Sequence, residues 1–289
     1  MKFGRIDLAD CGSPHAILKV ISELHEGNFV LPIPIEEWAR ELDIVDIQAL
    51  EVDGFEGGLM MFSDRSSGTI LYSQSANSRR KRFTIAHELG HFLMPSHVPR
   101  DGKAFMCKKS DMALFRVQPG GDRYIQMEVQ ANQLAAGLLM PQAAFELQLR
   151  RHTNFEIQHI PEIAETFDVS KEACCRRCVE ISDDLIAIII AKDCVVKNIY
   201  KNPAFPMISS KRGDRLSYLS NLKLNPGMVS DWKEDRADVW CTDTRGTICL
   251  QSLGQREGFS ITLLTYEAPE DQDEDEEVER RWSAPTFRR

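Results

Sequence analysis

An α+β fold is the class that the sequence predicts, and stretches of different hydrophobic period carry the prediction. Residues 1–50 place apolar side chains three and four apart, which is typical of amphipathic helices. Residues 47–73 consist of short apolar runs between turn residues, which indicates strands. Helical spacing returns between about 78 and 181, and residues 184–266 are again rich in strand-like runs. Helices and strands that keep to separate stretches of chain favour α+β over an alternating α/β fold.

The stretch up to residue 73 is predicted to form two helices and a small antiparallel sheet. The helices are expected at Ala16–His25 and Ile35–Leu42, and Pro34 suits the position just before the second. The runs IQALEV, GGLMMF and TILYS are interpreted as strands because the segments that separate them, DGFEGG and SDRSSG, have turn composition.

Two long helices are predicted next, at 78–94 and at 123–140, and Pro141 closes the second. Residues 95–122 between them are marked by proline and glycine and are expected to be irregular. Shorter helices are expected at 143–181. The strand-like runs of the last part are LIAIIIAK, CVVKNIY, ADVWCT, TICLQSL and FSITLLTY.

The composition predicts neither a membrane protein nor a nucleic-acid binder. The longest apolar run, Leu185–Ala191, is far too short to span a bilayer, and the N-terminus lacks the apolar core of a secretory signal. Eight mostly scattered cysteines without such a signal predict reduced thiols in the cytoplasm. The net charge of −9, to which residues 267–279 contribute nine acids and no base, is unsuited to binding phosphates by charge alone. Residues 269–289 are expected to be an acidic tail without fixed structure.

The strongest motif is His-Glu-Leu-Gly-His at residues 87–91, within the helix predicted for 78–94. Residues four apart lie on the same face of a helix, so the imidazoles of His87 and His91 can bind one metal ion. Glu88, beside the first histidine, can act as the general base toward water at the metal. The pattern predicts a zinc hydrolase. The alternative is a pair of core histidines that have this spacing by chance.

A catalytic zinc site takes three protein ligands, and the third is expected further along the chain. Glu128 is the leading candidate because it lies on the helix predicted for 123–140, near small residues such as Ala131 that allow another helix to approach closely. A carboxylate buried in such a contact needs a cation. The alternative is a solvated acid in the first turn of this helix. His97, six residues after His91, is a poor fit to the spacing of a third histidine ligand.

The two motifs together closely resemble the ImmA/IrrE family of bacterial and phage metallopeptidases. The resemblance rests on RFTIAHELGH at 82–91 and on ExQANxxAAxLLMP at 128–141, and it extends more weakly to about residue 181. It implies a zincin-like domain of the gluzincin type that holds one zinc ion per chain.

The resemblance also implies the roles of four residues in this chain. His87, His91 and Glu128 would bind the metal, and Glu88 would be the base. Three positions depart from the usual family pattern without touching this set of ligands: Gln130, Leu134 and Gly137.

Family members cleave helix-turn-helix repressors. The resemblance therefore implies an endopeptidase that acts on a specific regulatory protein in a stress or mobile-element response. Two alternatives from other classes stay open. One is a non-proteolytic regulatory protein that binds a repressor or DNA directly and keeps the metal site for structure. The other is a toxin or antitoxin partner whose acidic tail mimics nucleic acid.

Residues 160–181 have the pattern of a helix-turn-helix, with Ser170 as the cap of the second helix. Arg176 and Arg177 could contact DNA. Residues 141–180 nevertheless hold seven acids against five bases, so DNA binding is not the favoured interpretation. A structural pair of helices, or a surface that places a repressor substrate, are the alternatives.

Several further features have two interpretations each. The run Arg79–Arg82 would hold an acidic or nucleic-acid partner or form a solvated edge, and the solvated edge is favoured. Cys175 and Cys178 would form a metal or redox pair, although helix packing is favoured. Residues 69–73 would be an edge strand that holds an extended substrate by strand addition. The weak candidates for stabilising an oxyanion are Tyr124 and His97, and both could equally be packing or surface residues.

The domain organisation expected from these patterns has four parts. They are a zincin-like metallopeptidase domain at 1–141, a helix-turn-helix-like segment at 142–182, a strand-rich C-terminal domain at 183–268 and the acidic tail at 269–289. The strand-rich domain carries no cofactor motif, and either a ligand-sensing or a substrate-docking role is open to it.

Overall fold

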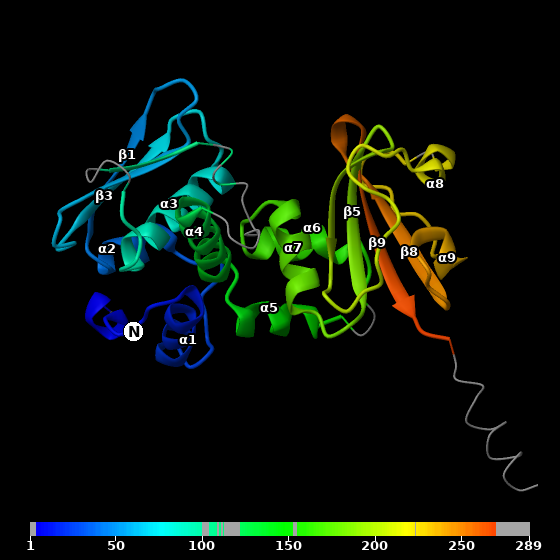
Figure 1. The fold of residues 1–289 in the computed structure, drawn as a ribbon, viewed down its shortest axis with the longest axis horizontal. Coiled ribbons are helices and arrows are strands. Elements are labelled where there is room, and N and C mark those ends of the chain that lie inside the picture. The colour runs from blue at the N-terminus through cyan, green and yellow to red at the C-terminus, as the bar shows by residue number, and fades with distance from the viewer. Residues whose placement is uncertain are drawn as a thin grey trace, which may run out of the picture. The chain divides into compact units, whose positions relative to one another are not determined.

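The structure is a computed structural model that describes residues 4–99, 104–108, 110, 112, 122–152, 155–222 and 224–269. The chain divides into two compact units, Met1–Ile181 and Ser182–Arg289 (Figure 1). Both units contain helices and a sheet, which confirms the α+β class. The tail expected at 269–289 lies outside the described residues, apart from Pro269.

The helices of the first unit follow the hydrophobic period of the sequence and begin at capping residues. Asn77 caps α3 by accepting a hydrogen bond from the Arg80 backbone N–H, and Asp122 caps α4 by accepting one from Tyr124. The helices described in this unit are η1 (Arg5–Leu8), α1 (Pro14–Leu24), α2 (Ile35–Glu41), α3 (Ser78–Leu93), α4 (Arg123–Leu139), α5 (Gln142–Leu149), α6 (His159–Thr166) and α7 (Lys171–Ile181).

The sheet of the first unit has the strand order β1-β3-β2-β4. Its strands are β1 (Ile44–Leu50), β2 (Gly57–Met61), β3 (Gly68–Ser73) and β4 (Ala104–Cys107). β2 is antiparallel to both β3 and β4, but β1 is parallel to β3. The expectation of a wholly antiparallel sheet was therefore wrong. Turn residues mark where strands end, but they do not show that β3 inserts between β1 and β2.

Helix α3 packs against the sheet and against α4. Its second half is buried from Thr84 to Leu93, as the apolar flanks of the motif predict. A Cβ atom built on Gly90 would lie 3.2 Å from the Cα atom of Ala131 in α4. The small residues at this crossing therefore let the two helix backbones approach closely.

The basic run at the start of α3 is paired within the first unit. Asp168, in the turn between α6 and α7, accepts ion pairs from both Arg79 and Arg82. The five pairs are Arg79–Asp168 at 3.1 Å, Arg79–Glu165 at 3.8 Å, Arg80–Glu56 at 2.9 Å, Lys81–Glu36 at 2.7 Å and Arg82–Asp168 at 3.3 Å. The run is thus neither a simple solvated edge nor a free anion-binding patch, because it joins α3 to its neighbours.

The second unit is an antiparallel sheet of order β6-β5-β9-β8-β7 with short helices. The apolar run predicted as a strand is β5, which is buried along nearly its whole length. The segment ADVWCT, also predicted as a strand, instead contains helix α9, whose Trp240 packs into the core. The elements described are β5 (Ile186–Lys192), β6 (Val195–Lys201), α8 (Ser217–Asn221), β7 (Lys233–Arg236), α9 (Ala237–Trp240), β8 (Thr247–Gly254), η3 (Arg256–Gly258) and β9 (Phe259–Glu267).

Candidate metal centre

The two histidines of the motif lie one turn apart on α3 and are fully buried. Their Nε2 atoms face each other at 3.2 Å. Burial lowers the pKa of His91 to about 3, so this imidazole is neutral at pH 7 and offers a lone pair. The helical spacing therefore produces the convergent pair of nitrogens that the sequence predicts.

Glu128 projects from α4 toward the same point and is also fully buried. Its Oε2 atom lies 3.2 Å from Nε2 of His87, and its Oε1 atom lies 3.5 Å from Nε2 of His91. The structure thus brings together the three residues that the sequence singled out as ligands, and it excludes the alternative of a solvated first-turn acid.

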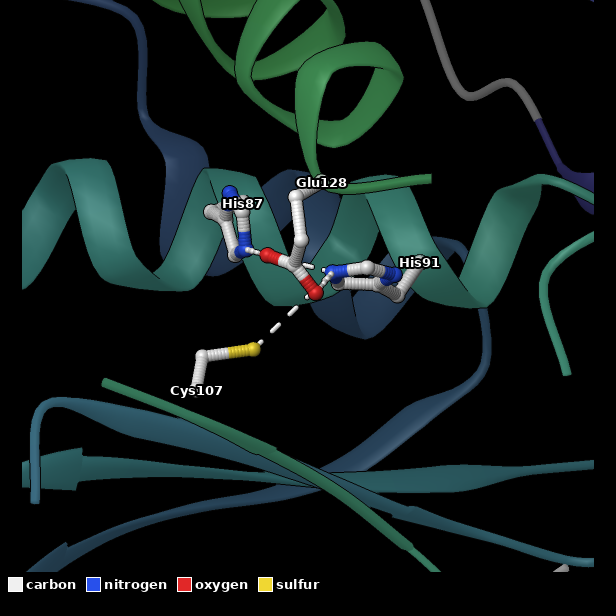
Figure 2. Close-up of side chains that lie close together, drawn as sticks. All are labelled: His87, His91, Cys107 and Glu128. Atoms are coloured by element: carbon white, nitrogen blue, oxygen red, sulfur yellow. Dashed lines mark hydrogen bonds and ion pairs between the residues drawn. The ribbon is translucent and has the colours of Figure 1, made fainter. Parts of the chain in front are cut away.

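A fourth potential ligand, Cys107, comes from the end of β4. Its sulfur lies 3.9 Å from Nε2 of His91. Ligand atoms of His87, His91, Glu128 and Cys107 all lie within 4.8 Å of one another (Figure 2). The sequence did not point to this cysteine, because β4 falls in a stretch that was expected to be irregular and no local pattern places Cys107 opposite the motif.

Glu88 lies beside this cluster, with its carboxylate buried between α3 and β2. A Cβ atom built on Gly57 of β2 would lie 2.7 Å from Oε1 of Glu88 and 2.5 Å from Cγ2 of Thr84, so only glycine fits there. Burial raises the pKa of Glu88 well above its ordinary value, the charge of Glu128 adds to that shift, and the thiol of Cys107 opposes it. A carboxylate with a raised pKa is suited to taking up a proton near neutral pH.

Hydrogen bonds behind the two histidines fix which ring nitrogen carries the proton. Nδ1 of His87 lies 2.9 Å from Oδ1 of Asn132, an oxygen that can only accept. Nδ1 must therefore hold the proton, and Nε2 is left free to face the cluster. Asn132 is one turn along α4 from Glu128, so the same helix supplies a candidate ligand and orients another.

His97 performs the same task for His91. Nε2 of His97 lies 3.0 Å from Oε1 of Gln130, and Nδ1 of His97 lies 3.0 Å from Nδ1 of His91. Since the Gln130 oxygen accepts, His97 carries its proton on Nε2 and accepts at Nδ1 the proton of His91. His97 therefore lies behind a candidate ligand and not on the open side of the cluster, which does not fit the oxyanion role. Tyr124, the other oxyanion candidate, is half-buried on the first turn of α4.

Replacing His97 with phenylalanine should weaken metal affinity about 10–100-fold, because the phenyl ring fills the space but cannot accept the His91 proton. Competition between the protein and a chromophoric chelator for zinc would measure this change. His15→Phe, at an exposed position on α1, is the matched control. Equal affinities in the wild type and the His97 variant would mean that His97 only fills space.

Arg65 secures the C-terminal end of α3. Its Nη1 atom donates to the carbonyl oxygens of Phe92 at 3.0 Å and Met94 at 2.8 Å, and its Nη2 atom donates to the carbonyl oxygen of His97. The last carbonyl oxygens of a helix have no partner within the helix, although that of Met94 also accepts a hydrogen bond from the backbone N–H of His97. One guanidinium therefore fixes both the motif helix and the loop that carries His97.

The edge strand expected at residues 69–73 is not at an edge. It is β3, and its two sides are paired with β1 and β2. Among the described strands, β1 and β4 form the edges of this sheet. Strand addition at residues 69–73 is thereby ruled out, because the backbone groups of β3 are already used.

The helix-turn-helix-like pair α6 and α7 does not expose both of the arginines that could contact DNA, Arg176 and Arg177. Arg177 is buried, donates to the carbonyl oxygen of Met140 at 3.1 Å and pairs with Glu180. Cys175 and Cys178 are buried in the same helix. Within the described part of the chain, the cluster of Figure 2 is the one group of three or more potential metal ligands, so the cysteine pair agrees with helix packing.

Comparison with known proteins finds one similarity in sequence, within the first unit, and one similarity in fold, over nearly the whole chain. Residues 40–179 match the sequence model of Peptidase_M78, described as the IrrE N-terminal-like domain. A Mycobacterium tuberculosis transcriptional regulator has a similar fold, with a TM-score of 0.54 at 11% identity over 99% of this chain and 98% of that chain. Comparison with curated protein sequences gives no match. No helix in the described ranges has the length and apolar character needed to cross a membrane. The match over residues 40–179 confirms the resemblance to the ImmA/IrrE family.

Proposed function

We propose that this protein is a zinc-dependent endopeptidase in which His87, His91 and Glu128 bind the ion and Glu88 is the general base. The observation that carries the proposal is a fully buried cluster of two imidazole nitrogens and a carboxylate that point at one another. Within the described residues, neither carboxylate oxygen of Glu128 accepts a hydrogen bond of ordinary geometry. A buried carboxylate so placed is stabilised by a cation.

The spacing of these atoms fits zinc. Tetrahedral nitrogen and oxygen ligands at about 2.0–2.1 Å from zinc lie roughly 3.3–3.4 Å from one another. The corresponding gaps between His87, His91 and Glu128 are 3.2, 3.2 and 3.5 Å. Calcium takes about 6–8 oxygen ligands, and this cluster does not offer them.

In the proposed reaction, Glu88, Asn132 and His97 have separate roles. A bound zinc ion would polarise the scissile carbonyl and lower the pKa of water toward about 7. The carboxylate of Glu88 takes up a proton from the attacking water and returns it to the leaving amine. Asn132 and His97 hold the Nδ1 protons of His87 and His91, so that both Nε2 atoms keep their lone pairs for the ion.

The substrate class follows from the family. A peptidase of this kind acts on a protein, and the resemblance to ImmA/IrrE proteins favours a helix-turn-helix repressor that is cleaved in the cytoplasm during a stress or mobile-element response. The pairing of Arg177 inside the first unit argues against direct reading of DNA by α7. The four-part organisation expected from the sequence, with a peptidase domain at 1–141, is part of this proposal.

A second candidate is a regulatory protein that keeps the metal for structure and does not cleave its partner. It is favoured by the likeness in fold, over nearly the whole chain, to a protein described as a transcriptional regulator. The two candidates share the metal site and differ in the role of Glu88.

Metal analysis of the purified chain tests the proposal first. We expect about one zinc per wild-type chain and strong loss of zinc in Glu128→Ala, because two imidazoles alone do not complete the site. Glu37→Ala, at an exposed position on α2, is the matched control and should keep its zinc. Wild-type protein without stoichiometric metal would overturn the peptidase assignment, and full occupancy in Glu128→Ala would remove this residue from the ligands.

A further inference from the structure

The strand β4 reaches the metal cluster from the side opposite to the helices. Figure 2 shows His87, His91 and Glu128 extending from α3 and α4, with Cys107 approaching from the strand layer. The thiol is buried, and its sulfur is directed at the nitrogens and the carboxylate. A cysteine among two histidines and a glutamate is chemically part of the cluster, because thiolates are among the ligands that zinc prefers.

We propose that Cys107 is a fourth protein ligand that closes the metal site in the resting protein, so that hydrolysis requires Cys107 to leave the ion. This inference rests on the proposed zinc site and deepens it. Zinc sites with three protein ligands leave a position for water, whereas sites with four are closed to it. The chain would then carry the ligand that blocks its own active site.

The distances support a place for sulfur in the coordination shell. A nitrogen at about 2.0–2.1 Å and a sulfur at about 2.3 Å from a tetrahedral zinc ion lie roughly 3.5–3.6 Å apart. Sulfur of Cys107 lies 3.9 Å from Nε2 of His91 and within 4.8 Å of the ligand atoms of His87 and Glu128, so it must move closer to the other three to bind the same ion. No other cysteine of the described residues belongs to this cluster.

The position of Cys107 conflicts with the role of Glu88. The carboxylate of Glu88 lies close enough to the thiol for Cys107 to influence its pKa. The water that Glu88 would activate must bind the ion within reach of this carboxylate, in the region that the sulfur of Cys107 occupies. Coordination by Cys107 and catalysis by Glu88 are therefore mutually exclusive states.

The strand that bears Cys107 is short and lies at the edge of the sheet. β4 has four residues and, among the described strands, pairs only with β2, where Cys107 lies opposite Gly57. Short edge strands open locally at a lower free energy than central strands. Withdrawal of β4 would leave His87, His91 and Glu128 in place, because all three lie on the helices.

X-ray absorption at the zinc edge tests the inference directly. Zinc-loaded wild-type protein should show one sulfur in the first shell at about 2.3 Å, and Cys107→Ala should lose this contribution while keeping zinc. Cys249→Ala, in the second unit, is the control and should retain the sulfur signal. Zinc-loaded wild type without a sulfur neighbour would overturn the inference but not the proposed peptidase, whereas wild type that binds no zinc would overturn the peptidase itself.

Acetohydroxamate provides a second measurement, since it binds a metal only at an open position. In cobalt-substituted protein we expect it to change the visible spectrum of Cys107→Ala and to leave the wild-type spectrum unchanged. An equal change in both proteins would show that the wild-type site is already open. Near-ultraviolet circular dichroism of the two proteins checks that the alanine variant is folded.

Discussion

Replacing Glu88 with glutamine should lower peptide hydrolysis by roughly 10²–10⁴-fold and leave the bound metal in place. Glutamine has nearly the same shape as glutamate, so it fits beside Gly57, but its amide cannot take up a proton. The Glu88 side chain is fully buried, and its carboxylate lies against Gly57 of β2 and beside the thiol of Cys107. Hydrolysis of a quenched fluorescent peptide library, together with metal analysis of the same samples, measures both quantities.

The same variant separates the two candidate functions. A peptidase loses its biological effect with Glu88→Gln, whereas a regulatory protein that only binds its partner keeps that effect. Glu37→Gln, on the exposed face of α2, is the control for a general consequence of removing an acid. Retained hydrolysis in Glu88→Gln would contradict the assignment of this residue as the base.

Replacing Arg65 with alanine should lower the free energy of unfolding of the first unit by about 2–4 kcal/mol. The guanidinium is half-buried and donates to four carbonyl oxygens at the end of α3 and in the loop that follows, those of His91, Phe92, Met94 and His97. Leaving buried acceptors without a donor costs about 1–3 kcal/mol each, and part of that cost is recovered when water enters. Urea denaturation followed by circular dichroism, in the absence of metal, measures the change.

Lysine at position 65 is the informative comparison. Lysine keeps the positive charge but lacks the planar guanidinium group, so it cannot donate hydrogen bonds to all of these carbonyl oxygens at once. We therefore expect most of the stabilisation that Arg65 contributes to be lost in this variant as well. Arg40→Ala, an exposed arginine on α2, should have little effect. Wild-type stability in both Arg65 variants would mean that other groups donate hydrogen bonds to the carbonyl oxygens at the end of α3.

The features of the site that depend on local spacing could be predicted from the sequence. His87 and His91 converge because a helix repeats every 3.6 residues, and the apolar flanks of the motif already indicated that α3 is buried. The position of Glu128 could not be predicted from helical spacing alone, because its contact with the histidines depends on the crossing of two helices. The small residues of α4 indicated that such a crossing was possible, and the resemblance to a family identified its partner.

The features that depend on pairing between distant segments could not be predicted. β4 was missed because a strand of four residues has no periodicity of its own, and Cys107 was missed with it. β3 was assigned to an edge because turn composition reveals where a strand stops but not which strands flank it. The basic run at the start of α3 looked solvated because its acidic partners, Glu36, Glu56 and Asp168, are scattered along the sequence.

The close crossing at Gly90 and Ala131 has a consequence for the choice of ion. His87 and His91 lie on one helix and Glu128 on the other, so the distance between the two helix axes determines which bond lengths all three ligands can make at once. A crossing this tight favours ions with short bonds, such as zinc at about 2.0–2.1 Å, over calcium, whose bonds are about 2.3–2.6 Å. A larger side chain at either position would separate the axes and shift the preference of the site toward ions of greater radius.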